Sequence, residues 1–379
     1  MFNIKKKSLR QIDKWLLLSI ICLCVYGNVV LYSAYSGNFS EVKTQIISTI
    51  IGFCAIILIS TMDIDFIKKL AKPIYLIAIL MLVMTLFIGQ GAEEWGSDSW
   101  VSIGPISFQP AEITKIGIIF ALARYIEINK ENINNFNVLI KVLFLSFLPV
   151  GLILMQPDFG TAMVYVVFIA AMLFVAGLSW KWIITLLLIF VAIIPVAYFF
   201  FDDYQKNRIL DFLDPSRDTS GTGWQQSQGL IAIGSGQFFG RGYMKGTQAQ
   251  YGYIPEKETD YIFSVLAEEL GFLGAIVMII LFTIMLFRMI MIAKNSKDSF
   301  ISFMTIGFFA MFFIHIFENV GMTIGLMPVT GIPLPFFSSG GTFQLINLIA
   351  IGLILSSSMQ KQPLDFKSMS NEPFAYYKK

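Results

Sequence analysis

Ten long apolar segments constrain this chain more than any other feature. Each approaches the length of roughly 18–20 residues that a helix needs to cross a bilayer. The segments are residues 15–34, 44–62, 74–89, 111–126, 138–155, 161–178, 182–201, 261–287, 300–321 and 342–357. Hydrophobic residues make up 56% of the chain and charged residues only 14%, which excludes a soluble globular protein. We therefore predict an all-α, polytopic membrane protein with ten transmembrane helices.

The basic residues predict how the helices are oriented. With the N-terminus in the cytoplasm, most of the 27 lysines and arginines lie on the inner side, as the positive-inside rule requires. An even number of helices then places both termini in the cytoplasm. Residues 202–260 form a large extracellular loop between spans 7 and 8, in which we expect an amphipathic helix near 204–213 or 224–234. We treat residues 1–357 as a single transmembrane domain and 358–379 as a cytoplasmic tail.

Composition excludes several classes of function. The net charge of +2 is too small to suggest nucleic acid as a partner. His315 is the only histidine, so a triad that needs a second histidine and a histidine-rich metal site are both excluded. The three cysteines, Cys22, Cys24 and Cys54, lie in apolar runs and do not suggest a disulfide framework. The first apolar run has no small-residue cleavage site near its end, and we expect it to stay as a signal anchor.

Asp260 lies where the chain re-enters an apolar helix, after a stretch crowded with Gly, Gln and charged residues. Two interpretations are open. Asp is a favoured helix N-cap; alternatively, a partly desolvated carboxylate has a raised pKa and suits a general base. At about 100° per residue, one stripe of small residues follows it, and such a stripe lets a ligand approach closely. The stripe consists of Asp260, Ser264, Ala267, Gly271 and Gly274, and Glu268 borders it.

Further polar groups lie at the outer ends of other helices. Glu112 and Lys115, close after Gln109, are three residues apart on a helix. The pair either stabilises the helix start or offers a lysine to a phosphate. Asp158 lies in a polar turn between spans five and six, and it either belongs to that turn or to a site.

Three other groups also allow both a structural and a functional interpretation. Ser338 and Ser339 precede two glycines and the last span, where backbone N–H groups suit an anion. We expect His315 with its neighbours Glu318 and Asn319 to join helices through hydrogen bonds. The charges of the long loop are mostly solvated in such a chain; Arg208, Glu256 and Lys257 are candidates, the last two because they lie close to Asp260.

Five stretches together resemble the signature blocks of the SEDS family (shape, elongation, division and sporulation), in the family's order. They read SWVSIGPISFQPAEITK, QPDFGTA, QSQGLIAIGSGQFFGRGY, IPEKETDYIFSVLAEELGFLG and PVTGIPLPFFSSGG. The short tails, Gly246-Thr247-Gln248 and the segment 328–331 resemble the elongation member, RodA, more than the division member, FtsW. Ser339 stands where the family usually has an aromatic residue, and Ile254 where it usually has Leu.

The resemblance implies an inverting peptidoglycan glycosyltransferase of the bacterial cytoplasmic membrane. Such an enzyme polymerises lipid II into glycan strands on the outer face, for cell elongation and shape, beside a class B penicillin-binding protein. The family's essential aspartate falls on Asp260, and its loop tryptophan on Trp100. A cation must stabilise the leaving diphosphate, either Lys115, Arg208, Lys257 or a divalent ion, Mg²⁺ or Mn²⁺. The alternatives are a flippase or other transporter of the lipid-linked precursor, a division or sporulation polymerase, and a scaffold.

We thus expect Asp260 to be catalytic and a further set of residues to contact the substrate. That set is Trp100, Gln109, Glu112, Lys115, Asp158, Arg208, Glu256, Lys257, Glu268, Ser338 and Ser339.

Overall fold

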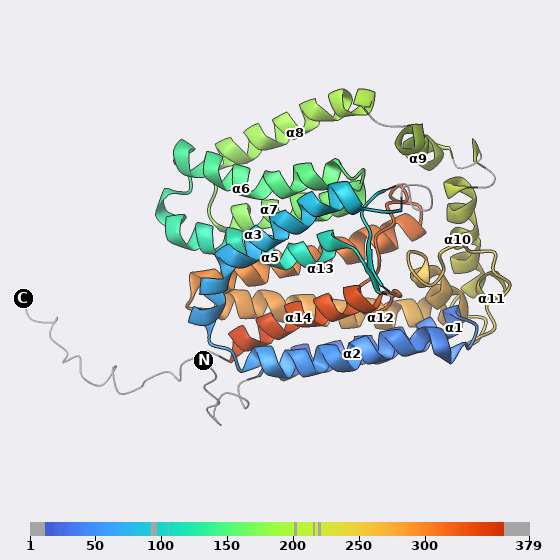
Figure 1. Cartoon of the computed structure of the whole chain (residues 1–379). Coiled ribbons are helices and arrows are strands. Elements are labelled where there is room, and N and C mark those ends of the chain that lie inside the picture. Colours follow the sequence, from blue (N-terminus) through green and yellow to red (C-terminus); the bar gives the residue numbers. More distant parts are fainter. Residues whose placement is uncertain are drawn as a thin grey trace, which may run out of the picture.

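The computed structural model describes residues 12–91, 97–104, 106–200, 203–214, 217–218 and 221–359, and these are mostly helical (Figure 1). A helix lies over most of each of the ten predicted ranges. They are α1 (Lys14–Ala34), α2 (Phe39–Ser60), α3 (Ile64–Ile88), α5 (Pro110–Asn129), α6 (Phe136–Leu154), α7 (Phe159–Val175), α8 (Trp180–Phe200), α12 (Ile262–Asn295), α13 (Ser299–Thr323) and α14 (Gly341–Ser358). A 3₁₀ turn, η2 (Lys130–Asn132), follows α5.

Seven of these helices are long and apolar enough to cross a membrane: α1, α2, α3, α6, α12, α13 and α14. The helix α7 has only 17 residues, and α5 carries Glu112 and Lys115 in its first two turns. In α8 the described apolar stretch, Trp180–Ile193, is also shorter than the other spans. The starts of α5 and α7 lie near the polar residues singled out above. All but the first two residues of the predicted tail, 358–379, lie outside the described part of the chain.

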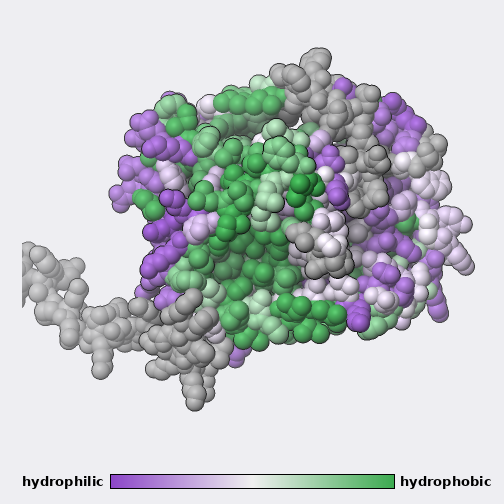
Figure 2. Space-filling view, viewed as in Figure 1, coloured by the Kyte–Doolittle hydropathy of each residue, from purple (hydrophilic) through white to green (hydrophobic). Residues whose placement is uncertain are grey.

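The helices pack side by side as one bundle (Figure 1). Helix α14 lies along α2, α1 lies along α12, and α13 packs against α5, α7 and α12. The surface carries a broad hydrophobic band between two hydrophilic ends (Figure 2). Large apolar side chains of the helices are exposed, among them Phe87 of α3 at 82% and Phe144 of α6 at 70%. Because water would not tolerate such a band, the chain is a multi-pass membrane protein.

The long loop forms three short helices across one end of the bundle (Figure 1). They are α9 (Asp203–Leu213), α10 (Thr222–Gly236) and α11 (Thr247–Gln250), so both stretches where a helix was expected are helical. Helix α10 packs closely on α12 at two glycines. A Cβ atom on Gly229 would lie 2.7 Å from the Tyr261 ring, and one on Gly236 would lie 1.9 Å from the carbonyl oxygen of Ala267. The glycines therefore fix α10 against the segment that follows Asp260.

Helix α12 is broken at Gly271, whose φ of 66° and ψ of −163° are not helical. The loop 237–242 crosses α12 at this break and satisfies the interrupted backbone. The N–H of Phe272 donates to the carbonyl of Gln237 (2.9 Å), and the N–H of Arg241 donates to that of Glu268 (3.0 Å). The predicted stripe of small residues from 260 to 274 is therefore wrong, because it assumed one continuous helix.

A two-stranded hairpin leads into α5. Strands β1 (Val101–Ile103) and β2 (Ile106–Phe108) are antiparallel. Just before β1, the backbones of Trp100 and Gln90 exchange two hydrogen bonds, of 2.8 and 3.2 Å. The hairpin thereby connects the end of α3 to the start of α5.

Candidate active site

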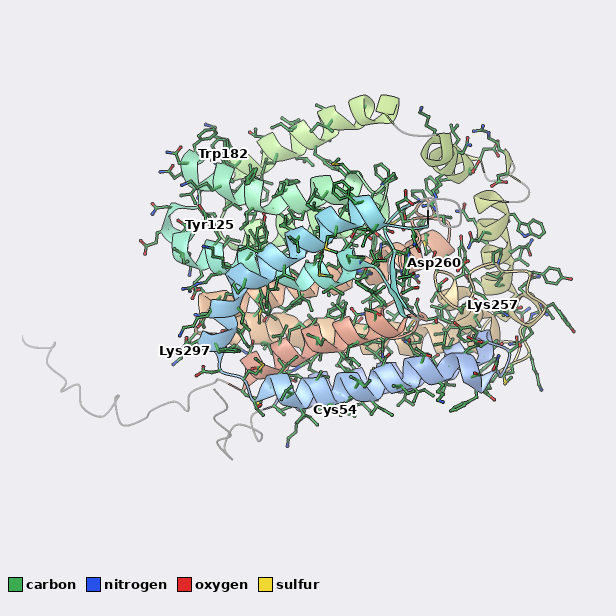
Figure 3. All side chains as sticks on the ribbon, viewed as in Figure 1. Cys54, Tyr125, Trp182, Lys257, Asp260 and Lys297 are labelled. Carbon is green, nitrogen blue, oxygen red and sulfur yellow. The ribbon has the colours of Figure 1, made fainter. Side chains whose placement is uncertain are left out.

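Asp260 lies just before α12, at one of the two polar ends of the bundle. Lys297 lies at the other end (Figure 3). The N-cap of α12 is Tyr261, and no side chain caps this helix through a hydrogen bond. Interpreting Asp260 as a capping residue is therefore wrong. Among the described residues, no hydrogen bond or ion pair reaches the Asp260 carboxyl group. The half-buried Asp260 carboxyl group therefore neither caps the helix nor forms a hydrogen bond or ion pair among the described residues.

The backbone that carries this carboxyl group is fixed from outside its own helix. The carbonyls of residues 258, 259 and 260 each accept a hydrogen bond. The donors are, in order, the Ser339 N–H (2.8 Å), the Ser338 hydroxyl (2.5 Å) and the Asn319 side-chain amide (2.9 Å). The two serines, predicted to contact substrate, thus position the Asp260 segment.

One side of the Asp260 carboxyl group is kept open by a glycine. Gly331 has a φ of +72°, and a Cβ atom there would lie 3.4 Å from Oδ2 of Asp260. This left-handed conformation favours glycine. A side chain at this position would therefore strain the backbone, and its Cβ atom would be in van der Waals contact with the carboxyl group.

The surroundings of Asp260 favour its protonated form. Burial raises the pKa of Asp260 to about 7, the nearby Glu256 carboxylate adds to the rise, and Arg208 opposes it. A carboxyl group with a pKa near the working pH exchanges protons readily in both directions. This is the property that a general base needs.

A second polar group lies on α5 and α13. The Lys115 ammonium, 1% exposed, contacts Oε1 of Glu112 at 2.7 Å and Nε2 of His315 at 2.7 Å. The predicted pair of Glu112 and Lys115 is confirmed. Since an ammonium group only donates, Nε2 accepts, and Nδ1–H donates to the carbonyl of Pro333 at 3.3 Å. His315 is thus neutral in this arrangement, and no local pattern in the sequence indicated its contact with Lys115.

Asp158 is a third polar side chain, close enough to Lys115 and Arg208 to feel their charges. It caps α7 through the N–H of Thr161 (3.0 Å) and accepts a hydrogen bond from Nε2 of Gln109 (2.5 Å). Burial raises the pKa of Asp158, while the positive charges of Lys115 and Arg208 oppose the rise. Arg208 on α9 acts in the same way on Asp260, so its charge reaches both carboxyl groups. Gln109, Lys115, Asp158, Arg208 and Asp260 therefore gather at one end of the molecule.

Glu268 differs from these residues because hydrogen bonds within the fold occupy its carboxylate. Its carboxylate accepts hydrogen bonds from the N–H groups of Gln248 (2.8 Å) and Ala249 (2.9 Å). It is completely buried, so a structural bond between α11 and α12 accounts for both oxygens. Lys257 similarly donates to the carbonyl of Ala249 (2.7 Å), and Glu256 accepts from the Thr259 hydroxyl (2.8 Å). Trp100 is half-buried at the base of the hairpin.

The described side chains do not converge on a site for a protein-bound metal ion. Within the part of the chain that the structure describes, no group of three or more His, Cys, Asp or Glu residues converges. Hard divalent cations prefer several oxygen ligands. No chemical step is therefore assigned to a metal here.

Comparison with known proteins supplies the context for this site. Residues 12–363 match the family model FTSW_RODA_SPOVE, described as "Cell cycle protein". The chain is 33% identical over 357 residues to the peptidoglycan glycosyltransferase MrdB of Escherichia coli K12, covering 93% of this chain and 95% of MrdB. It is 35% identical over 362 residues to the stage V sporulation protein E of Bacillus subtilis 168, covering 91% and 96% of the two chains.

Solved structures agree with these sequence relatives. One chain belongs to a study of the "structural coordination of polymerization and crosslinking by a peptidoglycan synthase complex". It aligns with a TM-score of 0.79 at 29% identity, over 92% of this chain and 97% of its own length. The rod shape determining protein RodA of Thermus thermophilus aligns with a TM-score of 0.70 at 27% identity, over 93% and 98% of the two chains.

Proposed function

This chain belongs to the FtsW, RodA and SpoVE family, and from this premise we propose that it is a peptidoglycan glycosyltransferase that polymerises lipid II. It is a multi-pass protein of the bacterial cytoplasmic membrane. The donor, a disaccharide-peptide on undecaprenyl diphosphate, keeps its lipid in the bilayer and its sugar outside. A polar site at one end of a helical bundle meets both requirements (Figure 2).

The observation that carries the proposal is the state of Asp260. Its carboxyl group caps no helix, has a pKa of about 7, and stands on a backbone that three hydrogen bonds fix. In the proposed step Asp260 takes the proton of the acceptor 4-hydroxyl group. The oxygen attacks the anomeric carbon of the donor with inversion, and the diphosphate leaves. A general base of this kind contributes about 10²–10⁴-fold to the rate.

The leaving diphosphate needs positive charge. Lys115 uses two donor positions, on Glu112 and His315, and a third remains for a phosphate oxygen. Arg208 is the other candidate, because its charge reaches Asp158 and Asp260 alike. Such preorganised charges act where negative charge develops and are worth several kcal/mol in a dry site.

Supporting observations extend the proposal to topology and partner. Helices at all ten predicted ranges support ten spans with both termini in the cytoplasm and residues 202–260 outside. Cysteine labelling from either side of intact cells tests this: a cysteine at Gln248 should react from outside only. Alignment with a chain from a peptidoglycan synthase complex supports a class B penicillin-binding protein as partner. Co-purification with the transpeptidases of the same cell tests that pairing.

We further propose that the product serves elongation and cell shape. Similarity to the rod shape determining protein RodA supports this, whereas relatives named for division and sporulation match at 34% and 35% identity. Depletion distinguishes the roles. Rounded cells support elongation, filaments indicate division, and normal growth with failed spores indicates sporulation.

The central experiment incubates the purified protein with lipid II, with and without the partner. We expect glycan strands that a muramidase digests. A flippase predicts the reverse: in vesicles, lipid II crosses the bilayer and no polymer forms. Polymerisation that exhaustive EDTA abolishes and Mg²⁺ or Mn²⁺ restores would add a divalent cation, carried by the substrate diphosphate, to the reaction.

A further inference from the structure

Two side chains on one face of α13 contact both functional groups of the site. His315 and Asn319 are four residues apart, so they lie one above the other on the helix. His315 contacts the Lys115 ammonium (2.7 Å), and Asn319 contacts the carbonyl of Asp260 (2.9 Å). Their exposed fractions are 1% and 0%. Neither contact is available to solvent, and neither is needed to form α13 itself.

The same two side chains also bind adjacent carbonyls of one extended segment. Nδ1 of His315 donates to the carbonyl of Pro333 (3.3 Å), and the Asn319 amide donates to that of Ile332 (2.8 Å). This segment includes Gly331, which borders the Asp260 carboxyl group. Each residue thus forms one bond to a reactive group or its backbone and one to the shared segment.

The hydrogen-bond partners determine which way the Asn319 amide points and which ring nitrogen of His315 carries the proton. The Asn319 amide nitrogen faces two carbonyls, and its oxygen has no hydrogen-bond partner among the described residues. A flipped amide would place three oxygens together, which is unfavourable. His315 must accept from the ammonium and donate to the carbonyl, so only the tautomer with a proton on Nδ1 fits.

We infer that His315 and Asn319 are positioning residues that set the distance between the base, Asp260, and the cation, Lys115. This inference rests on the proposed function. The base precedes α12 and the cation lies on α5, and α13 packs against both of these helices. Catalysis depends steeply on such distances, because a misplacement of about 1 Å can cost about 10²-fold.

The test for His315 compares two substitutions. One keeps the contact with Lys115 and the other keeps the contact with Pro333. Gln places its amide oxygen near the position of Nε2, and Asn places its amide nitrogen near that of Nδ1. We expect His315→Gln to retain the KM for lipid II and His315→Asn to raise it about tenfold, the value of one hydrogen bond to a charged group. A purely structural role predicts the opposite order, since Asn keeps the bond to Pro333.

The test for Asn319 uses a matched control one turn further along α13. Thr323 is equally buried, and within the described chain its hydroxyl bonds only to carbonyls of α13, those of Asn319 and Val320. We expect Asn319→Leu to lower kcat about tenfold or more without changing KM, as loss of a transition-state contact does. Thr323→Val should lower the melting temperature in detergent to a similar extent and leave kcat unchanged.

Three outcomes decide between the inference and the premise. If the Asn319→Leu and Thr323→Val variants have the same kcat, or if the His315→Gln and His315→Asn variants have the same KM, the positioning role is refuted. Either result counts against the positioning role alone if the wild type polymerises lipid II and the Asp260→Asn variant does not. In that case the proposed function is retained. If the wild type forms no polymer, the proposed function fails, and the inference fails with it.

Discussion

The two ends of the bundle use their charged residues differently. At the end that carries Lys297, charges form matched pairs: Lys68 bridges Glu127 (2.6 Å) and Asp298 (2.7 Å), and Arg288 pairs with Asp13. At the other end, the carboxyl groups of Asp260 and Glu318 have no hydrogen-bond or ion-pair partner among the described residues, and Glu318 is only 1% exposed.

This contrast separates structural from functional charge. Partly exposed ion pairs of this kind contribute little to the free energy of unfolding, and they need no functional explanation. Unpaired, partly buried carboxyl groups destabilise the fold, so their presence indicates a function that repays the cost. The comparison predicts that substitutions at one end change activity and those at the other change only stability.

The largest effect is expected from Asp260→Asn. The amide has the same shape but cannot take a proton, so polymerisation should fall by about 10²–10⁴-fold. Measurement is by glycan formation from lipid II. Melting temperature should stay the same or rise, because an unpaired acid is removed. An Asn variant that polymerises at the wild-type rate excludes Asp260 as the base.

Lys115→Met should have the next largest effect. We expect kcat/KM to fall about 10²–10³-fold, as when one preorganised donor is removed. It also leaves Glu112 buried without its partner, which costs about 3–5 kcal/mol in comparable cases. The double variant with Glu112→Gln should regain stability in a melting experiment but not activity. Recovery of both would make the pair purely structural.

The pH dependence provides a smaller effect. Asp260 acts as a base only when deprotonated, and its pKa is about 7. The value of kcat/KM should therefore rise with pH up to about 7 and fall about tenfold per unit below it. Because Glu256 contributes to the raised pKa, Glu256→Gln should move this limb to lower pH. If kcat/KM of the wild type stops rising near pH 4 and not near pH 7, the pKa of Asp260 does not control the pH dependence.

The smallest effect is expected at the opposite end. Asp298→Asn keeps the cap of α13, since Asn caps helices as well as Asp, and it removes one of the two partners of Lys68. Stability should change by at most about 1 kcal/mol, with kcat and KM unchanged. Altered kinetics here would break the contrast between the two ends.

Periodicity and hydropathy predicted the helices well, because bilayer thickness and backbone hydrogen bonding leave few alternatives. The ion pair of Glu112 and Lys115 was also predictable, since its partners are one helical turn apart. The break at Gly271 was not, because the groups that satisfy it come from residues 237–242 of the preceding loop. Asp260 was identified, but its two interpretations could be separated only by the observed cap.

The remaining site contacts join residues far apart in the chain. Lys115 and His315 are 200 residues apart, and Asn319 reaches Asp260 across 59. No local pattern encodes such pairs. Ser338 and Ser339 illustrate the same limit, because a glycine-rich helix start suggested an anion site and the structure uses both serines to hold a neighbouring segment.

The interruption at Gly271 divides α12 into two mechanical parts. Residues 262–270 are bonded to the preceding loop through Arg241 and Gly242. The lower half is bonded to the same loop at its first two residues, Phe272 and Leu273, and then continues as a helix to Asn295. Transmembrane helices change their tilt when the thickness of the surrounding bilayer changes. An unbroken rod would carry that tilt directly to the aspartate at its tip. Because Gly271 interrupts the rod and the preceding loop holds both sides of the break, we expect a change of tilt in the lower half to be transmitted less fully to the acid.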